Sequence, residues 1–234
     1  MSILDNPAWA ALNGPHQGLA EVHGRARRYP VDVSPFVGVP LGDDDGARAD
    51  LRALVGPGGS LVMIGNGVAV PEDWTVDFSG DGVQLVATDR LGTAPFGDAV
   101  VLGDEDAEEM LDLTARTKPG PFLPRTHVMG TYLGVRREGR LVAMAGERLH
   151  PPGWTEISAV CTDPDFRGQG LGTRLVQAVG HGIRARGEIP MMHAAATNDS
   201  AIRLYRALGF EIRREVSFFA ARAPAAEGAL EYGT

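Results

Sequence analysis

The stretch "DPDFRGQGLGTRLV", Asp163–Val176, joins a strand-like segment to a helix-like segment through three closely spaced glycines. The preceding "TEISAVCT" has the apolar, β-branched character of a buried strand. Apolar residues then recur at every fourth position, as on one face of a helix: Leu171, Leu175, Val179 and Ile183. Free backbone N–H groups and the positive end of a helix dipole attract anions at such a junction. The stretch therefore predicts a phosphate-binding loop.

Two common phosphate loops do not fit this spacing. A dinucleotide-binding fingerprint needs a third glycine where Thr173 stands, and no acidic residue ends a second strand about 20 residues later. A nucleoside-triphosphate loop needs Gly-Lys-Ser or Gly-Lys-Thr, which the stretch lacks. A tight turn that binds nothing remains the plain alternative. The pattern that fits is Arg-x-x-Gly-x-Gly, with Arg167, Gly170 and Gly172 at its defining positions.

This pattern resembles the acetyl-coenzyme A loop of the GNAT superfamily of N-acetyltransferases. Downstream, "NDSAIRLYRALGFE" resembles the second signature of that family, through Asn198, Ala201, Leu204, Tyr205, Leu208, Gly209 and Phe210. The resemblance covers about residues 96–222. It implies an α/β fold of the α+β type, in which helices flank a mixed, mostly antiparallel sheet. It also implies acetyl-coenzyme A as co-substrate.

The resemblance further implies where each part of acetyl-coenzyme A binds. The pantetheine arm is expected between the strands "EISAVCT" and "PMMHAAAT", paired with backbone groups of Val160, Cys161 and Thr162. The loop amides are expected to hold the pyrophosphate, next to the charge of Arg167, and belong to Gly168, Gln169, Gly170, Leu171, Gly172 and Thr173. A backbone N–H near Val160 is expected to stabilise the oxyanion. Asn198 is expected to steady the arm, and Tyr205 to protonate the departing thiolate as general acid.

Glu156 is the predicted general base. Amine acceptors titrate near ~8 to ~10.4, so a proton must leave the amine before attack. Strand alternation puts Glu156 on the same face as Ser158 and Val160. Glu147, His193 and water are the alternative candidates for the general base. The non-catalytic alternative for Glu156 is a solvated charge at the end of a strand.

Several of these residues also have ordinary structural uses. Tyr205 can be a core aromatic residue, and Asn198 can be only a helix cap. Cys161 lies inside an apolar strand, where cysteine behaves as a small hydrophobic residue, so covalent catalysis is not expected. The remaining histidines are scattered and form no metal-ligand spacing with the single cysteine. We therefore expect no metal.

The composition narrows the class of protein. With 44% hydrophobic and 22% charged residues, the 234-residue chain is expected to be globular. A net charge of -8 disfavours binding to nucleic acid or to an anionic membrane. One cysteine excludes an intramolecular disulfide and favours a reducing, cytoplasmic setting. No apolar run reaches the ~20 residues that span a bilayer.

Patterning along the chain suggests two domains with a boundary near Pro95. A smaller N-terminal α/β domain, residues 1–95, is expected to hold a helix in "ARADLRALVG" and strands in "SLVMIG" and "GVQLVATD", the latter after a turn at Ser79–Gly82. The acetyltransferase-like domain is expected over 96–224, with "FEIRREVSFFAARA" as the strand that closes its sheet. Residues 225–234 form a tail without periodicity.

The expected function is transfer of an acetyl group from acetyl-coenzyme A to an amine, by direct attack in a ternary complex. The acceptor class, a small molecule or a peptide, stays open, as does a homodimer. The N-terminal half, with Trp74 and Phe78, is expected to cover the acceptor side or to form an interface. The alternative from another class is an acyl-coenzyme A-binding regulatory or interaction module with little turnover. A structural scaffold has no specific support.

Overall fold

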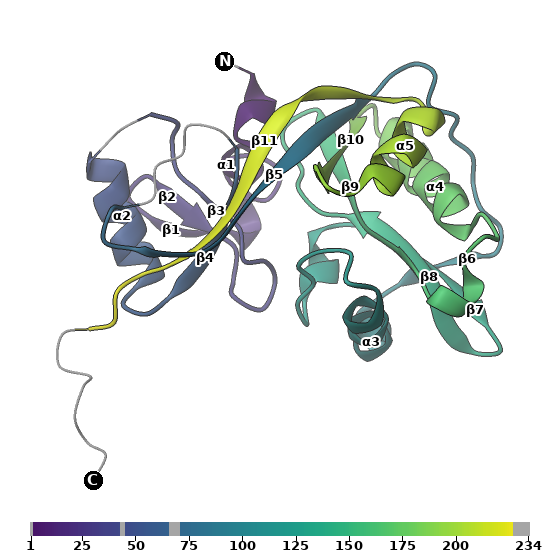
Figure 1. The fold of residues 1–234 in the computed structure, drawn as a ribbon, viewed down its shortest axis with the longest axis horizontal. Helices are drawn as coiled ribbons and strands as arrows, with labels where there is room; N and C mark the ends of the chain where they lie inside the picture. The colour runs from purple at the N-terminus through teal and green to yellow at the C-terminus, as the bar shows by residue number, and fades with distance from the viewer. Residues whose placement is uncertain (1, 43–44, 66–70, 227–234) are drawn as a thin grey trace, which may run out of the picture.

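The computed structural model describes residues 2–42, 45–65 and 71–226. An eight-stranded sheet with the strand order β4-β11-β5-β10-β9-β8-β7-β6 runs through the described chain (Figure 1). Its strands are β4 (Ser60–Ile64), β5 (Thr75–Ala87), β6 (Ala99–Leu102), β7 (Tyr132–Arg137), β8 (Arg140–Glu147), β9 (Trp154–Thr162), β10 (Ile189–Ala195) and β11 (Phe210–Arg222). Every neighbouring pair is antiparallel except β9 and β10. The predicted mixed, mostly antiparallel sheet is confirmed.

Three helices cover the two faces of this sheet. Helices α4 (Leu171–Ala185) and α5 (Asp199–Leu208) pack on one face, here called the α4 face, where the predicted apolar stripe of α4 is fully buried. Helix α3 (Ala107–Thr117) packs on the opposite α3 face, through Met110 and Leu113 against Met144 of β8. No helix in the described ranges is long and apolar enough to cross a membrane.

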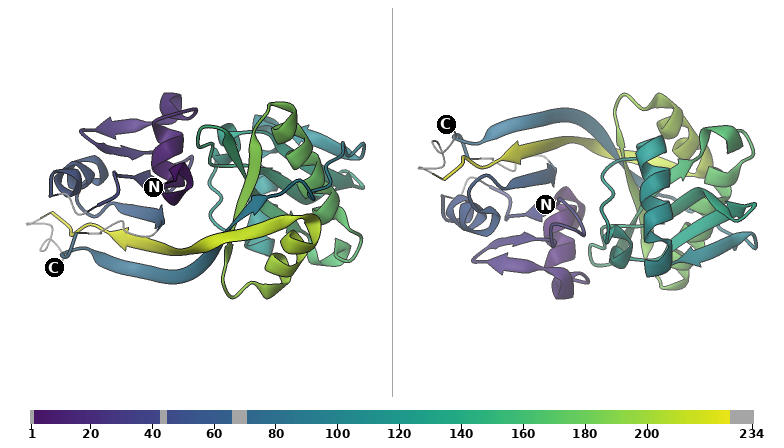
Figure 2. Two further views of the ribbon diagram at one scale, coloured as in Figure 1. Left: turned by 90° about the horizontal axis from the view of Figure 1, so that it is seen from above. Right: turned by 90° about the horizontal axis from the view of Figure 1, so that it is seen from below.

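The N-terminal segment packs on the α3 face as well. Leu4, Ala8 and Phe36 join one hydrophobic cluster with Met191 of β10 and Val216 of β11. The small elements here are η1 (Ile3–Asp5), α1 (Pro7–Leu12), β1 (Glu21–His23), β2 (Ala26–Arg28), β3 (Val37–Gly38) and α2 (Asp45–Val55). Helix α2 is the helix predicted in "ARADLRALVG". Figure 2 shows these elements gathered at one end of the molecule, with β5 and β11 running side by side between the two ends.

The main sheet crosses the predicted boundary between residues 95 and 96. Strand β5, which lies before that boundary, pairs with β10 on one side and with β11 on the other. Strand β4 pairs with β11 and forms one edge of the sheet, so β11 lies inside the sheet and does not close it. The division between residues 95 and 96 therefore stays a prediction about which parts of the chain fold as separate units. Strands β4 and β5 precede it, but they belong to the sheet of the C-terminal half.

The predicted turn at Ser79–Gly82 is wrong. All four residues lie within β5 and pair with Val216–Phe219 of β11. The Phe218 ring occupies the space that a side chain on Gly82 would need, so this glycine serves close packing within the sheet. Residues 225 and 226 have no regular structure, and the rest of the predicted tail, 227–234, lies outside the described residues.

Candidate active site

Strands β9 and β10 pair only at their beginnings. Glu156 and Met191 form the last pair, although β9 continues to Thr162 and β10 to Ala195. Beyond this pair, β9 stays bonded to β8 and β10 to β5, so the two strands diverge and face each other across an opening. An extended chain can add its own hydrogen bonds between such edges. This opening is the split that the resemblance implied for the pantetheine arm.

A β-bulge interrupts β9 inside the split. Met144 lies opposite Cys161 and Gly146 opposite Ser158, so β9 has one residue more than β8 over this interval. Ala159 lies within it and has a φ of 52°, a left-handed conformation that non-glycine residues rarely adopt. The bulge redirects the backbone next to Val160, where an oxyanion-stabilising N–H was predicted. Sequence reasoning missed the bulge, since alanine carries no signal for it.

One short 3-10 helix, η5 (Pro164–Phe166), joins the end of β9 to the glycine loop. Gly168 and Gly170 have φ values of 77° and 71°, and a side chain at either position would point into open space. Gly170 caps α4 without any side-chain hydrogen bond, which leaves the first helical N–H groups facing outward. In the described chain, no protein acceptor is seen for the loop amides from Gly168 to Thr173. The predicted loop residues therefore present a row of backbone donors without acceptors among the described residues.

Arg167 supplies a cation beside this row. Its Nε donates to the carbonyl of Thr162 at 3.3 Å, and the side chain is exposed. Further along α4, the guanidinium of Arg174 lies 4.2 Å from the centre of the Phe96 ring. An anion at the loop would meet backbone donors and one mobile positive charge.

Tyr205 and Asn198 lie on α5, next to the split. Tyr205 is buried in the cluster that fills the α4 face, with Phe210 edge-on to its ring at 6.3 Å. Burial raises the pKa of Tyr205 to about 12, and the nearby Cys161 thiol adds to the effect. The hydroxyl thus keeps its proton at neutral pH, as a general acid must. Asn198 caps α5 by accepting from the backbone N–H of Ala201 at 3.2 Å, so its ordinary structural role is present.

Glu156 occupies the closed vertex of the split and is completely buried. Its carboxylate accepts two hydrogen bonds from Arg148, at 2.9 and 2.7 Å, and one from His193 at 2.7 Å. Burial alone would raise the pKa of Glu156, but Arg148 and His193 outweigh it and hold the pKa well below its usual range. A carboxylate held this way is a weak proton acceptor, so the geometry disfavours the predicted role as general base.

Both ring nitrogens of His193 have hydrogen-bond partners. Gln84 donates from Nε2 to the Leu4 carbonyl at 2.9 Å, while its Oε1 accepts from Arg213 at 2.7 Å. The same Nε2 lies 3.0 Å from His193 Nε2, which must therefore accept. With Nε2 as the acceptor from Gln84, His193 donates from Nδ1 to Glu156. Both of its nitrogens are occupied, which removes it as a free base.

The other predicted candidates lie apart from this vertex. Glu147 faces the α4 side, where Arg186 donates to it at 2.8 Å. Cys161 is buried against α3, and burial raises the pKa of its thiol to about 11, so the thiol stays protonated. Neither residue is an exposed base or nucleophile.

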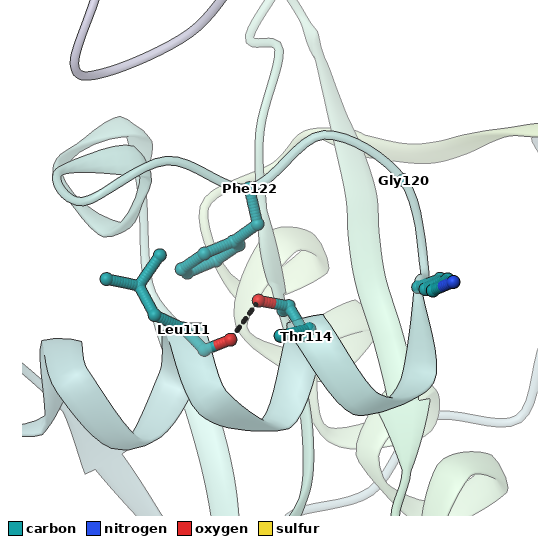
Figure 3. A pocket seen from close by; sticks show the side chains of 6 residues that line it. Leu111, Thr114, Gly120 and Phe122 are labelled. Atoms are coloured by element: carbon teal, nitrogen blue, oxygen red, sulfur yellow. Dashed lines mark hydrogen bonds between the residues drawn. The ribbon is translucent and has the colours of Figure 1, made fainter.

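An apolar hollow of about 480 Å³ lies along the C-terminal half of α3. In Figure 3 the Phe122 ring lies above the helix, and the Thr114 hydroxyl donates to the Leu111 carbonyl at 2.9 Å. Phe122 also meets Tyr132 edge-on, at 5.7 Å between ring centres. None of the predicted site residues lines this hollow.

Comparison with known proteins decides the family. A crystal structure described as a GNAT-family acetyltransferase from Novosphingobium aromaticivorans is 37% identical to this chain and superposes with a TM-score of 0.87. The match covers 97% of this chain and 100% of that one. The chain belongs to the GNAT family. The FR47-like protein family model also matches this GNAT chain, over residues 132–219, which include the split and the glycine loop.

Other relatives agree with the GNAT assignment at lower coverage. Mycothiol acetyltransferase of Thermomonospora curvata is 33% identical over 146 residues, which are 61% of this chain and 46% of that protein. N-alpha-acetyltransferase RimI of Mycobacterium tuberculosis is 37% identical over 83 residues, 34% of this chain and 51% of that protein. The chain thus spans about half the length of these two relatives. A Kribbella flavida GNAT structure, 21% identical with a TM-score of 0.60 over 95% of this chain and 97% of its own, shares the fold.

Proposed function

We propose that this chain transfers an acetyl group from acetyl-coenzyme A to an amine, by direct attack in a ternary complex. The observation that carries the proposal is the succession of two features along the chain. The split beside β9 offers hydrogen-bonding edges for an extended arm, and after β9 one short 3-10 helix, η5, leads into the glycine loop. Such a path suits a long ligand with an amide-rich arm and a phosphate end.

The residues present fit coenzyme A. The outward-facing amides of Gly168 to Thr173 would hold the pyrophosphate, and Arg167 would add charge. Val160, Cys161 and Thr162 contribute the β9 edge for the pantetheine arm, and Asn198 would steady that arm from α5. When bound, acetyl-coenzyme A supplies an acyl thioester that an amine can attack.

Within the split, two groups would act on the charges that develop during attack. The backbone N–H next to the Ala159 bulge would stabilise the oxyanion, because the bulge redirects it out of the β8 ladder. Tyr205 would give its proton to the departing thiolate, and its raised pKa keeps that proton available. We assign the removal of the amine proton to water, since Glu156 and His193 are fully bonded to their neighbours.

The acceptor is proposed to be a primary amine on a small molecule or at a peptide N-terminus. The names of the two relatives, mycothiol acetyltransferase and N-alpha-acetyltransferase RimI, cover both types. Two places on the α3 face are candidates for binding the acceptor: the surface of the N-terminal segment and the hollow beside Phe122. The charge and composition of the chain give no reason to propose nucleic acid, membrane or metal as a partner.

The deciding experiment measures free thiol released from acetyl-coenzyme A with amines, amino acids, antibiotics and peptides as acceptors. Coenzyme A binding is confirmed first by calorimetry. Acceptor-dependent thiol release supports the enzyme. Tight coenzyme A binding without release on any acceptor would instead favour the acyl-coenzyme A-binding module, and failure to bind coenzyme A would reject both.

A further inference from the structure

A second hollow, of about 270 Å³, lies on the α4 face at the C-terminal half of α4. Phe96, Leu133 and Val179 give it an apolar wall, and Glu147, His181 and Arg186 give it polar groups. It is smaller than typical pockets for drug-sized ligands, which measure roughly 300–1,000 Å³. None of the residues assigned to acetyl transfer lines it, so it is separate from the split and from the glycine loop.

Glu147 is the buried charge of this hollow. Only 4% of its side chain is exposed, and its oxygens accept from Arg186 at 2.8 Å and from the backbone N–H of Thr131 at 3.1 Å. His150 Nε2 lies 3.6 Å from the second oxygen, and burial lowers the pKa of His150, which favours the neutral ring. A carboxylate accepts about four hydrogen bonds, so Glu147 keeps capacity for a further donor.

Glu147 shares its cationic partner, Arg186, with a second carboxylate. Arg186 also lies 3.2 Å from Glu188, and 41% of its side chain is exposed. Two carboxylates thus share one guanidinium, which leaves these three groups with a net charge of -1. A buried carboxylate is stabilised by a close positive donor, and the hollow is the open route to it.

We propose that this hollow binds a small primary amine with an apolar body. The ammonium group donates to Glu147, and the apolar body lies against Phe96, Leu133 and Val179. Arg186 is the one Arg or Lys among the residues that line the hollow, and Glu147 and Glu188 both hold it, so an anion would find no free cation in this lining. A zwitterion would have to draw Arg186 away from both carboxylates before its own carboxylate found a partner. The net negative charge therefore favours a ligand with a single positive charge. The apolar wall favours a hydrocarbon or aromatic body over a polar one.

The test uses 2-phenylethylamine as the probe and follows protein amide NMR shifts at millimolar concentrations, in the presence of saturating coenzyme A. Shifts are expected at Thr131 and Gly182, which line the hollow. The carboxylate analogue 3-phenylpropionate, of the same size, is expected not to bind there. Absence of amine binding, or equal binding of the two probes, overturns the proposal.

Two matched variants assign the charge. Glu147→Gln keeps the shape and removes the charge, so the affinity for 2-phenylethylamine is expected to fall about tenfold or more. Glu188→Gln removes an equal charge from the same guanidinium but does not line the hollow, so the affinity of this variant for 2-phenylethylamine is expected to fall less than that of Glu147→Gln. Equal affinity in Glu147→Gln and in the wild type contradicts the proposal.

A third variant closes the space without touching the charge. Gly182 is helical, and a Cβ there would approach only Arg186 at 4.0 Å, so Gly182→Leu fills the hollow without backbone strain. Amine binding is expected to disappear while the fold, read from the NMR spectrum, persists. If binding persists in Gly182→Leu, the amine binds elsewhere and the proposal fails. Because these measurements read binding alone, they stand whether or not acetyl transfer is observed.

Discussion

Polar groups near the start of β9 and in the loop that follows its end differ in whether the described chain offers them hydrogen-bond partners. At the closed vertex, Glu156 is completely buried and every close neighbour donates to it, including Arg148 and His193. At the open end, the amides of the loop around Gly170 face outward, and the described chain offers them no acceptor. Burial makes an unmet polar group costly, so a satisfied centre belongs to the fold and a row of unmet donors belongs to a ligand. The contrast sets a buried centre with satisfied polar groups against exposed donors that a ligand could use.

The largest effect is expected at the closed end, from Arg148→Met. Removal of this partner leaves Glu156 buried without its main cation, which should lower the free energy of unfolding by about 3–5 kcal/mol. Urea denaturation measures the loss. Arg52→Met is the control, since the Arg52–Asp73 pair is exposed to solvent and its loss should have a far smaller effect. If the double variant Arg148→Met/Glu156→Leu recovers most of the lost free energy of unfolding, the loss in Arg148→Met comes from the unpaired charge of Glu156. Equal, small losses in Arg148→Met and Arg52→Met would contradict the prediction.

Acid should weaken the closed end next, through His16. Its ring is buried with Tyr29, which packs near Glu156, and burial, followed by the adjacent His150, lowers the pKa of His16 to about 4. Below pH ~6.5 the unfolded chain binds a proton at this histidine, whereas the native chain does not. The contribution of His16 to the free energy of unfolding is therefore fully present above pH ~6.5 and is lost as the pH falls toward 4. The total loss from this residue is about 3 kcal/mol.

Unfolding free energies at pH 7 and at pH 4.5 measure this loss. His16→Phe should flatten the pH dependence. His23→Gln, a change at an exposed histidine, should leave it unchanged. An undiminished slope in His16→Phe would assign acid sensitivity to other groups.

At the open end, Tyr205→Phe should reduce turnover about 100-fold while the affinity for coenzyme A stays near that of the wild type. The ring keeps its packing against Phe210, and only the proton donor is lost. Steady-state rates with the identified acceptor, together with calorimetry, separate the two effects. Because the pKa of Tyr205 is about 12, the wild-type rate should show no high-pH decline from this residue below pH ~10. Undiminished turnover would assign the proton to solvent.

Gly170→Val should weaken coenzyme A binding about tenfold or more, since a branched side chain would occupy the space in front of the loop amides and resist the left-handed backbone. Gly187→Val is a matched control: Gly187 also has a left-handed φ, of 79°, with open space around it, but lies beyond the end of α4. Calorimetry on both variants should show the defect only at Gly170. The same loss in both would point to strain in α4 rather than to the loop.

The smallest change is expected for Asn198→Ala, which removes the cap of α5 and should cost about 1 kcal/mol of stability. Asn198→Asp retains the cap, so it separates the cap from any contact with the pantetheine arm. Thermal unfolding and calorimetry are measured on both. Loss of coenzyme A affinity in Asn198→Asp, with stability intact, would show a second role for the amide; unchanged affinity in both variants would leave Asn198 a cap only.

Sequence alone predicted those parts whose signal is local. The stripe from Leu171 to Ile183 gave α4, and the glycines gave the loop, because both depend on neighbours within one or two turns. The charged vertex was not predictable in this way. Glu156, His193 and Gln84 come from three separate strands and Arg148 follows the end of a fourth, β8, so only strand pairing brings their side chains together. Single acidic residues carry no sign of such partners, which is why Glu156 was expected to be a base.

The domain boundary failed to describe the sheet for a related reason. Pro95 and the glycines around it mark a real loop, but a loop does not reveal which strand pairs with which. Strand β5 finds both of its partners more than a hundred residues downstream. The bulge at Ala159 likewise depends on its register against β8, which no local pattern contains.

The position of β11 between β4 and β5 also bears on how the chain reaches its native state. Strand β11, the last of the described strands to be synthesised, must enter between two strands made much earlier, so the sheet is completed only after β11 has left the ribosome. Contacts between residues so distant in sequence slow folding, because a long loop must close before any of them forms. Until then, the β5 edge of residues 75–81, which carries Val76 and Phe78, stays without its partner, and it is the segment that a nascent chain most needs to keep from pairing with another molecule.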